Sequence, residues 1–427
     1  MRGKGIVFAL VAVYACAHFA TSRLPWDVAQ SPIRGSDLSS YYTAARLVRA
    51  GRASSLYEVA PGDTILGDAT SGPYRETGEA AGIERQHYYI YPPFFALLFL
   101  PLGALSFGAA MNVWLALDLL LLAAFLAMSI RGRADTTGPE AAFAVAVCCF
   151  EFLPMIWAMA VGQTSLLVLV LLTGTLLAWR RGSDAAAGAL LGLAVAIKLT
   201  PVLLGVFFWW RGRRTTAIVS CAVFLLTQAI SIAALGWEPH RAFFLDVVPS
   251  MAAGTSYFLN QSLTGFFDRL MTGDDVREVA VAASPAARAI SLLAGALAVA
   301  FTAWRLRRVV TASPPADELQ FGAVILLTLL VSPISWTHHY LLAVLPILAV
   351  ASSLLRESRP PVWAAAALGL AWLLIARKPH PDLFLTGPAR LLNSGALAGS
   401  LLLLFLCLRA LAPPPGAPGV NEPGRTA

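Results

Sequence analysis

The sequence predicts an all-α, polytopic membrane protein. Of its 427 residues, 58% are hydrophobic and only 13% are charged, and the mean hydropathy is +0.69. A soluble domain carries roughly 25% charged residues, so this chain has too few charges to cover a water-facing surface. Apolar runs of about 20 residues, the length that a helix needs to cross a bilayer, recur along the whole chain.

Arginines and lysines occur in short clusters between the apolar runs, as cytoplasmic anchors do, so the formal charge of +7 does not indicate a nucleic-acid partner. We assign six clusters to the cytoplasm: Arg2/Lys4, Arg131/Arg133, Arg180/Arg181, Arg211/Arg213/Arg214, Arg305/Arg307/Arg308 and Arg356/Arg359. About twelve spans follow, with both termini inside: 6–24, 107–130, 140–161, 164–180, 184–198, 199–211, 215–236, 284–304, 318–332, 339–355, 361–376 and 388–410. The parity closes if segment 92–106, which Pro101 breaks, is re-entrant or a half-helix.

The same topology predicts one transmembrane domain, residues 1–412, followed by a Pro/Gly-rich, disordered cytoplasmic tail at 413–427. It places a large first loop (25–91), a second loop (237–283) and the turns near 162–164, 198, 332–339 and 377–382 on the extracytoplasmic face. The Ala/Gly/Arg/Pro-rich composition indicates a GC-rich bacterium, so the expected location is its inner (plasma) membrane. The five cysteines all lie in apolar stretches and predict neither disulfides nor a metal site.

The first loop contains a helical pattern at residues 36–49. Its apolar positions repeat at helical spacing, which predicts a helix lying in the interface plane. Asp37 stands at the start of this helix. It is either an N-cap or a carboxylate that the helix dipole keeps ionised, able to act as a base, and the two roles are compatible.

Other polar residues lie near the ends of the spans. Segment 88–91 is tyrosine-rich and precedes Pro92-Pro93, which is typical of an aromatic belt before a proline-started helix. Lys198 ends an Ala/Gly/Leu-rich span, where it either snorkels or pairs. Asp118 and Glu151 lie within apolar spans and are functional candidates with no assignable partner.

An ordered set of short motifs resembles glycosyltransferase family 87, also described as the domain of unknown function 2029 family. The motifs are Asp37 with Tyr41-Tyr42, Tyr91-Pro92-Pro93, Gly162-Gln163, Lys198-x-x-Pro201, Asn260-Gln261-Ser262, and Ser332-Pro333 with Ser335-Trp336 and His338-His339. The resemblance covers roughly residues 30 to 350. One departure is Ser165, which stands where the family's Gly-Gln-x-Asn motif has asparagine.

The resemblance implies a GT-C fold, a site on the outer face, a polyprenyl-phosphate sugar donor (usually mannose), and neither cofactor nor obligatory metal. A phosphate is already a good leaving group, so one carboxylate base suffices where a glycoside hydrolase needs two carboxyl groups. We expect Asp37 to be that base, taking the proton from a hydroxyl group of a lipid or glycan acceptor. Membrane lipids are the other expected partners. Lys198, His338 and His339 are the candidates for the donor phosphate. The candidates for substrate binding are Tyr41, Tyr42, Tyr91, Gln163, Asn260, Gln261 and Ser335.

Two points stay open at this stage. Adjacent histidines point in different directions on a helix, so we expect one of His338 and His339 to contact the donor phosphate and the other to be structural, with His338 favoured. Broken helices and buried charges are also typical of transporters, so a lipid or small-molecule flippase is the alternative function. A non-catalytic assembly factor is a third possibility.

Overall fold

The computed structural model describes residues 13–132, 151–272, 276–277, 279, 282–309, 313–357, 359–377 and 388–411. Their secondary structure is helical apart from three isolated β-bridges, which confirms the all-α prediction. Several predictions fall outside the described residues: the Arg2/Lys4 cluster, the burial of Cys148 and Cys149, and the tail 413–427.

The α-helices differ widely in length, from five residues to 26. The α-helices are α2 (Ser36–Arg49), α3 (Gly72–Glu79), α4 (Pro93–Leu98), α5 (Phe107–Gly132), α7 (Leu153–Val161), α8 (Ser165–Arg180), α9 (Asp184–Ile197), α10 (Val202–Trp210), α11 (Arg214–Leu235), α12 (Glu238–Ala242), α13 (Val248–Ala252), α14 (Leu263–Met271), α15 (Pro285–Leu306), α16 (Pro314–Val331), α17 (Val344–Arg356), α18 (Val362–Ala376) and α19 (Gly395–Ala410). Tighter 3₁₀ or wider π segments are η1 (Phe19–Ala29), η2 (Ala53–Tyr57), η3 (Leu102–Ala104), η5 (Phe243–Val247), η6 (Thr337–Ala343) and η8 (Pro388–Ser394).

Membrane-length helices form the bundle. Five described helices are long and apolar enough to cross a bilayer: Phe107–Ile130, Arg214–Leu235, Pro285–Leu306, Thr337–Arg356 and Pro388–Ala410. Three shorter apolar helices accompany them: Ser165–Arg180, Asp184–Ile197 and Val362–Ala376. The count of twelve spans therefore stays a prediction. Helix α4 has six residues and is about 9 Å long, which agrees with a half-helix in segment 92–106.

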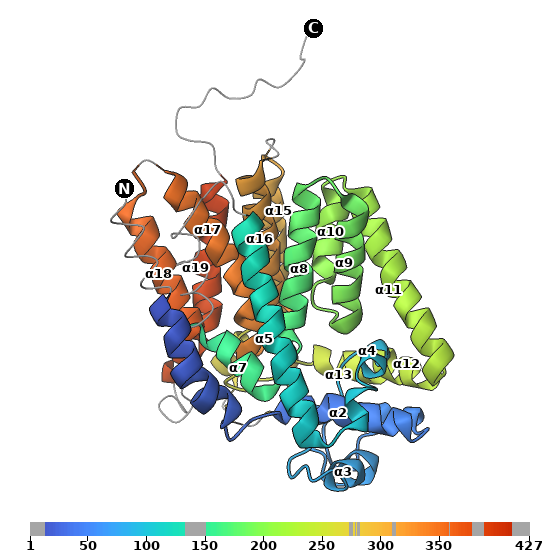
Figure 1. Ribbon diagram of the computed structural model, residues 1–427. Helices are drawn as coiled ribbons and strands as arrows, with labels where there is room; N and C mark the ends of the chain where they lie inside the picture. The colour runs from blue at the N-terminus through green and yellow to red at the C-terminus, as the bar shows by residue number, and fades with distance from the viewer. Residues whose placement is uncertain are drawn as a thin grey trace.

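Three predicted basic clusters meet at one end of the bundle, which we call the basic end; it lies at the top of Figure 1. Contacts between helix ends bring these clusters together: Arg180 Nη1 with Glu318 Oε1 (2.6 Å), Arg211 Nη2 with the Val309 carbonyl (3.3 Å), Arg213 Nη1 with Asp184 Oδ2 (3.5 Å) and Arg305 Nη2 with the Leu408 carbonyl (3.3 Å). The arginine clusters thus share one side of the molecule, as a common cytoplasmic assignment requires.

The opposite end, which we call the site end, carries helices α2, α3, α4, α12 and α13 beneath the bundle (Figure 1). Helix α2 forms where the sequence predicts, but it does not lie half-exposed as an interface helix. Nine of its 14 residues are buried, because α3, α4, η2 and η3 pack around it. The tyrosines at 88, 89 and 91 are also buried, so the aromatic-belt prediction is wrong, whereas α4 does start at a proline.

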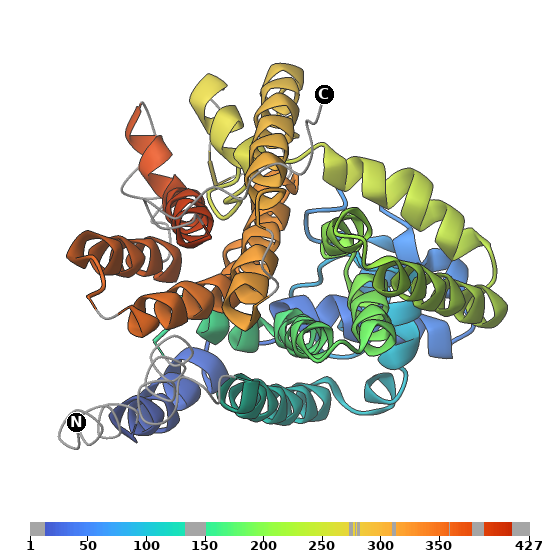
Figure 2. The same cartoon turned by 90° about the horizontal axis from the view of Figure 1, so that it is seen from above.

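Viewed from above, α8–α11 form one group and α15–α19 another (Figure 2). The Ala/Gly-rich sequence of α9 explains its close contact with α11. A Cβ atom at Gly188 would lie 2.5 Å from the Thr216 carbonyl oxygen, and one at Gly192 would lie 2.6 Å from that of Ser220. Small residues four positions apart therefore let the two helix backbones touch, as in many membrane bundles.

Two predicted span boundaries are wrong. The first helix does not end at residue 24 but continues through Pro25 to Ala29, because a π segment absorbs the proline inside the helix. The span predicted at 140–161 is not one helix in its described part, since residues 151 and 152 are non-helical and α7 begins at Leu153 with Pro154 at its start.

Candidate functional site

Asp37 lies in the first turn of α2 but does not cap it. The N-cap is Gly35, whose φ of 71° favours glycine, and a Cβ atom there would lie 2.6 Å from Met111 Sδ. The Gly35 N–H donates to the Ala160 carbonyl of α7 at 2.8 Å, which fixes α2 against that helix. The N-cap prediction for Asp37 is therefore wrong, and its half-buried carboxylate is left for another partner.

That partner is Gln163. Gly162 ends α7 in the left-handed conformation, with φ of 76°, and turns the next side chain towards α2. Gln163 Nε2 then donates to Asp37 Oδ2 at 2.6 Å. Gln163 Oε1 accepts from the Tyr91 hydroxyl at 2.9 Å and from the Thr164 N–H at 3.3 Å. Because a backbone N–H can only donate, these contacts fix which end of the amide faces the carboxylate.

The environment of Asp37 works in two directions. Burial raises the pKa of its carboxyl group above the ordinary value. The charge of His87, the hydrogen bond from Gln163 and the charge of Lys198 each favour the ionised form and oppose that rise. The net effect is that the pKa of Asp37 lies above that of an exposed aspartate, which suits a general base.

Lys198 is paired and does not snorkel. It follows α9 in an extended conformation, and its Nζ lies 2.6 Å from His339 Nε2 and 5.6 Å from the centroid of the Tyr91 ring. When Lys198 is protonated, its ammonium group donates to His339 Nε2, which places the ring proton of this histidine on Nδ1. Tyr91 thus connects the Asp37–Gln163 pair to the Lys198–His339 pair.

The two histidines lie on η6, a 3₁₀ segment, and not on a regular α-helix. Their rings are in contact edge to face, with centroids 4.6 Å apart and planes at 79°. That only one of the two contacts the donor phosphate stays a prediction. His338 Nε2 and His339 Nδ1 are buried and have no hydrogen-bond partner. Buried orphan groups of this kind are costly, which makes them candidates for contact with a ligand.

Asn260, Gln261 and Ser335 are fully buried, and they hold two loops together. Asn260 Nδ2 donates to the carbonyls of Thr255 (2.9 Å) and Pro333 (3.0 Å), and its Oδ1 accepts from the Ser335 N–H (2.9 Å). Gln261 donates to the carbonyls of Phe258 and Asn393, and the Ser335 hydroxyl donates to that of Leu329. These contacts give the three residues a positioning role beside η6.

The predicted tyrosines differ in their placement. Tyr41 is buried and its ring packs against that of Tyr91, with centroids 4.8 Å apart. It therefore supports the tyrosine that donates to Gln163. Tyr42 is turned away from it: its hydroxyl donates to the Leu105 carbonyl at 2.8 Å and accepts from Arg46 Nη1 at 3.2 Å. Tyr42 is therefore the one predicted site tyrosine that the fold separates from the rest.

Glu151 and Asp118, the two acidic residues without an assigned role, differ in their contacts. Glu151 has partners: its Oε2 accepts from Arg23 Nη2 at 3.2 Å, and its Oε1 lies 3.5 Å from His18 Nε2. Asp118 is buried in α5 with no hydrogen-bond partner for either oxygen. Within the residues that the structure describes, no group of three His, Cys, Asp or Glu side chains could hold a metal ion.

Sequence reasoning missed His87, whose charge acts on Asp37, and Asp68, which holds His87 at 2.9 Å. The only signal was their position in the first loop near the tyrosine run.

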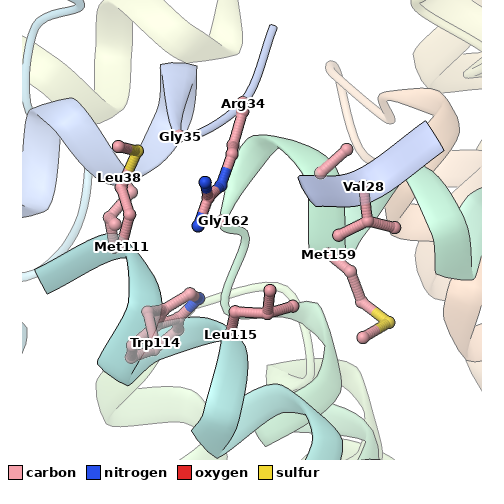
Figure 3. A pocket seen from close by; sticks show the side chains of 10 residues that line it. Val28, Arg34, Gly35, Leu38, Met111, Trp114, Leu115, Met159 and Gly162 are labelled. Atoms are coloured by element: carbon pink, nitrogen blue, oxygen red, sulfur yellow. The ribbon is translucent and has the colours of Figure 1, made fainter. Parts of the chain in front are cut away.

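A pocket lined in part by Gly162 lies between η1, α2, α5 and α7. Apolar side chains such as Leu38, Met111 and Trp114 line it, and the Arg34 guanidinium points into it (Figure 3).

Comparisons with known proteins agree with the arrangement of these motifs. The model of glycosyltransferase family 87 matches residues 89–333. A polyprenol-phosphate-mannose-dependent alpha-(1-2)-phosphatidylinositol pentamannoside mannosyltransferase of Mycobacterium tuberculosis is 29% identical over 67% of this chain, and the match spans 63% of that protein, less than two thirds of its length. A polyprenol-phosphate-mannose-dependent alpha-(1-2)-phosphatidylinositol mannoside mannosyltransferase, also of Mycobacterium tuberculosis, is 30% identical over 69% of this chain, and the match spans 68% of that protein.

A third similar protein is the pentamannoside mannosyltransferase of Mycolicibacterium smegmatis, 28% identical over 68% of this chain and 69% of its own. No solved structure matches the chain significantly. The family match covers more than half of the sequence and runs from the tyrosine segment through the Gly-Gln turn and Lys198 to Pro333. The chain therefore belongs to glycosyltransferase family 87.

Proposed function

We propose that this protein is a membrane glycosyltransferase that moves a hexose, which we assign as mannose, from a polyprenyl-phosphate donor to a lipid or glycan acceptor on the extracytoplasmic face. Asp37 acts as the general base. The observation that carries the proposal is the Asp37–Gln163 contact of 2.6 Å beside the Lys198–His339 pair, joined through Tyr91. The names of the similar proteins, which specify polyprenol-phosphate-mannose and phosphatidylinositol mannosides, support this donor and an acceptor of that kind.

In this reaction the acceptor hydroxyl oxygen forms a bond to the anomeric carbon, and the bond from that carbon to the phosphate oxygen breaks. Asp37 takes the hydroxyl proton, and polyprenyl phosphate leaves with the electron pair. The sugar passes through an oxocarbenium-like state, and the departing phosphate needs no acid to protonate it. A base whose pKa burial has raised takes the proton more readily than an exposed aspartate would.

Lys198, His338 and His339 hold the donor phosphate in this proposal. The fit rests on donors: the lysine ammonium is cationic, and the buried His338 Nε2 and His339 Nδ1 lack partners. A phosphate oxygen next to these atoms would satisfy them, and charge developing on the leaving group would be stabilised by donors already in place. Since His339 also contacts Lys198, it becomes the primary phosphate histidine, in place of the His338 favoured by sequence.

The alternative, a flippase without transferase activity, predicts movement of the lipid-linked sugar with no chemical change. The direct test incubates membranes that contain the protein with mannose-labelled polyprenyl phosphate and follows the label by chromatography. Transfer to a new, alkali-stable product that Asp37→Asn abolishes supports the proposal. Label that stays on the donor in wild-type membranes, while it crosses the bilayer, would favour the flippase.

A further inference from the structure

The pocket between η1, α2, α5 and α7 is lined by none of the residues assigned to the donor phosphate. Its volume is about 230 Å³, below the roughly 300–1,000 Å³ of a pocket for a drug-sized ligand, so it fits one segment of a larger molecule. Most of its wall is apolar and consists of Val28, Leu38, Met111, Leu115, Met159 and Ala160. A wall of this kind favours a hydrocarbon chain.

Two nitrogen donors complete the wall. The Arg34 guanidinium points into the pocket, and the indole nitrogen of Trp114 lies on the side of the ring that faces it (Figure 3). Trp114 is only 4% exposed, and its buried Nε1 has no hydrogen-bond partner. A buried donor without an acceptor is costly, which makes it a candidate for contact with a ligand.

Arg34 keeps its charge and most of its donors for a ligand. Its Nη2 donates to Asn112 Oδ1 at 2.6 Å, which holds the guanidinium in place without neutralising it, because an amide is uncharged. Among the residues that the structure describes, no carboxylate pairs with Arg34. An arginine of this kind, next to an indole N–H, fits the oxygens of a phosphate group.

The surroundings of the pocket face lipid. Only 28% of the apolar window in Phe107–Ile130, the membrane-length part of α5, is buried inside the protein. Near the pocket, Ile33 and Val113 are exposed by 38% and 48%. Asn112 is exposed near the start of α5, at the site end, so Arg34 lies where a basic side chain meets lipid headgroups at the end of a span.

We propose that this pocket binds one anionic phospholipid of the bilayer. A phosphate oxygen accepts from Arg34 and from the Trp114 N–H, and the first part of an acyl chain packs against Leu115 and Met159. Charge selects the lipid, since the cation of a zwitterionic headgroup would be repelled by Arg34 and an anionic headgroup carries none. The phospholipid is a bound partner and not a substrate, so the inference goes beyond the proposed reaction.

A lipid in this pocket contacts both helices that form the base site. The Gly35 N–H of α2 donates to the Ala160 carbonyl of α7 at 2.8 Å, and both residues line the pocket. Asp37 and Gln163 lie within three residues of this joint along the chain and contact each other at 2.6 Å. Because the lipid binds only where the two helices meet, it stabilises the folded protein by mass action.

The test uses the purified full-length protein in nanodiscs of phosphatidylcholine with increasing fractions of phosphatidylglycerol. Native mass spectrometry counts the phosphatidylglycerol that stays bound, and the thermal unfolding temperature is measured on the same samples. The wild type should retain one more phosphatidylglycerol than Arg34→Gln and should unfold at a higher temperature as the fraction rises. Arg34→Gln should weaken retention by about tenfold to a hundredfold, the effect of losing a charge-assisted hydrogen bond. Leu115→Phe, which fills the pocket and keeps the arginine, should weaken it as well.

Arg49→Gln is the matched control. Arg49 is exposed at the end of α2, at the same end of the molecule, and is not among the residues that line this pocket. This variant should retain phosphatidylglycerol as the wild type does. Equal retention in the wild type and Arg34→Gln, or equal losses in Arg34→Gln and Arg49→Gln, would refute the site. Displacement of the bound phosphatidylglycerol by polyprenyl phosphate would assign the pocket to the donor lipid and overturn the proposal.

Discussion

Replacing Gln163 by leucine should change the pH at which the enzyme becomes active. The substitution keeps much of the side-chain volume but removes the N–H that donates to Asp37 Oδ2 at 2.6 Å. A hydrogen bond to a charged group contributes about 1.5–3 kcal/mol. One pKa unit corresponds to about 1.36 kcal/mol, so the pKa of Asp37 should rise by about one to two units.

The sign follows from which form the hydrogen bond stabilises. Gln163 lowers the pKa of Asp37 against the burial that raises it, so its loss favours the protonated carboxyl group, which cannot act as a base. In plots of kcat/KM against pH, the acid limb of Gln163→Leu should move up by the same one to two units. Activity should recover towards the wild-type plateau at higher pH.

Tyr91→Phe is the matched comparison. It keeps the Gln163–Asp37 contact and removes only the hydroxyl that donates to Gln163 Oε1 at 2.9 Å. Its acid limb should therefore move less than that of Gln163→Leu. The assay is transfer from labelled polyprenyl-phosphate mannose across a pH series. A Gln163→Leu profile with a lower plateau but an unmoved acid limb would refute the idea that Gln163 acts through the ionisation of Asp37.

Four further outcomes are expected. Asp37→Asn should lower transfer by about 10²–10⁴-fold. Burial raises the pKa of Asp37 in the folded protein, so ionisation of this carboxyl group lowers the stability of the fold as pH rises towards that pKa. The asparagine variant does not ionise, so its thermal unfolding temperature should not fall at neutral pH. His339→Ala should raise the donor KM more than the acceptor KM, as steady-state kinetics can show. Asn260→Ala leaves buried groups unpaired and should destabilise the fold by about 1–3 kcal/mol in denaturant unfolding. In a cysteine-free background, an impermeant thiol reagent should label cysteine at Glu76 but not at Arg181 in intact spheroplasts; the reverse pattern would overturn the orientation.

The composition and the basic clusters were enough to predict the helices, the bundle and its two ends, because these features follow from the solvent properties of the bilayer. The site could be predicted only in part. Gln163 and Lys198 interrupt apolar spans, so they are visible in the sequence, and the fold brings them together with Asp37 through Tyr91. The pairing itself could not be predicted, since it depends on long-range contacts between segments more than 70 residues apart.

Other errors have local physical causes. The capping role predicted for Asp37 failed because Gly35 adopts the left-handed conformation and starts the helix two residues earlier. The contact between the His338 and His339 rings could not be predicted from residue spacing, because it depends on the rotamers of the two side chains and not only on the angle between neighbouring positions. His87 carries no motif of its own. Its neighbour Gln86 is buried against α2, where it accepts from the Thr43 hydroxyl, and sequence periodicity does not reveal this contact.

The central claim is that this chain transfers a lipid-linked sugar with Asp37 as base, and one measurement tests it most directly. Purified protein in nanodiscs is given mannose-labelled polyprenyl phosphate or, separately, labelled GDP-mannose, each with the same acceptor membranes. The account predicts transfer from the polyprenyl-phosphate sugar alone and its loss in Asp37→Asn. Transfer from GDP-mannose without polyprenyl phosphate, or full activity in Asp37→Asn, would contradict it.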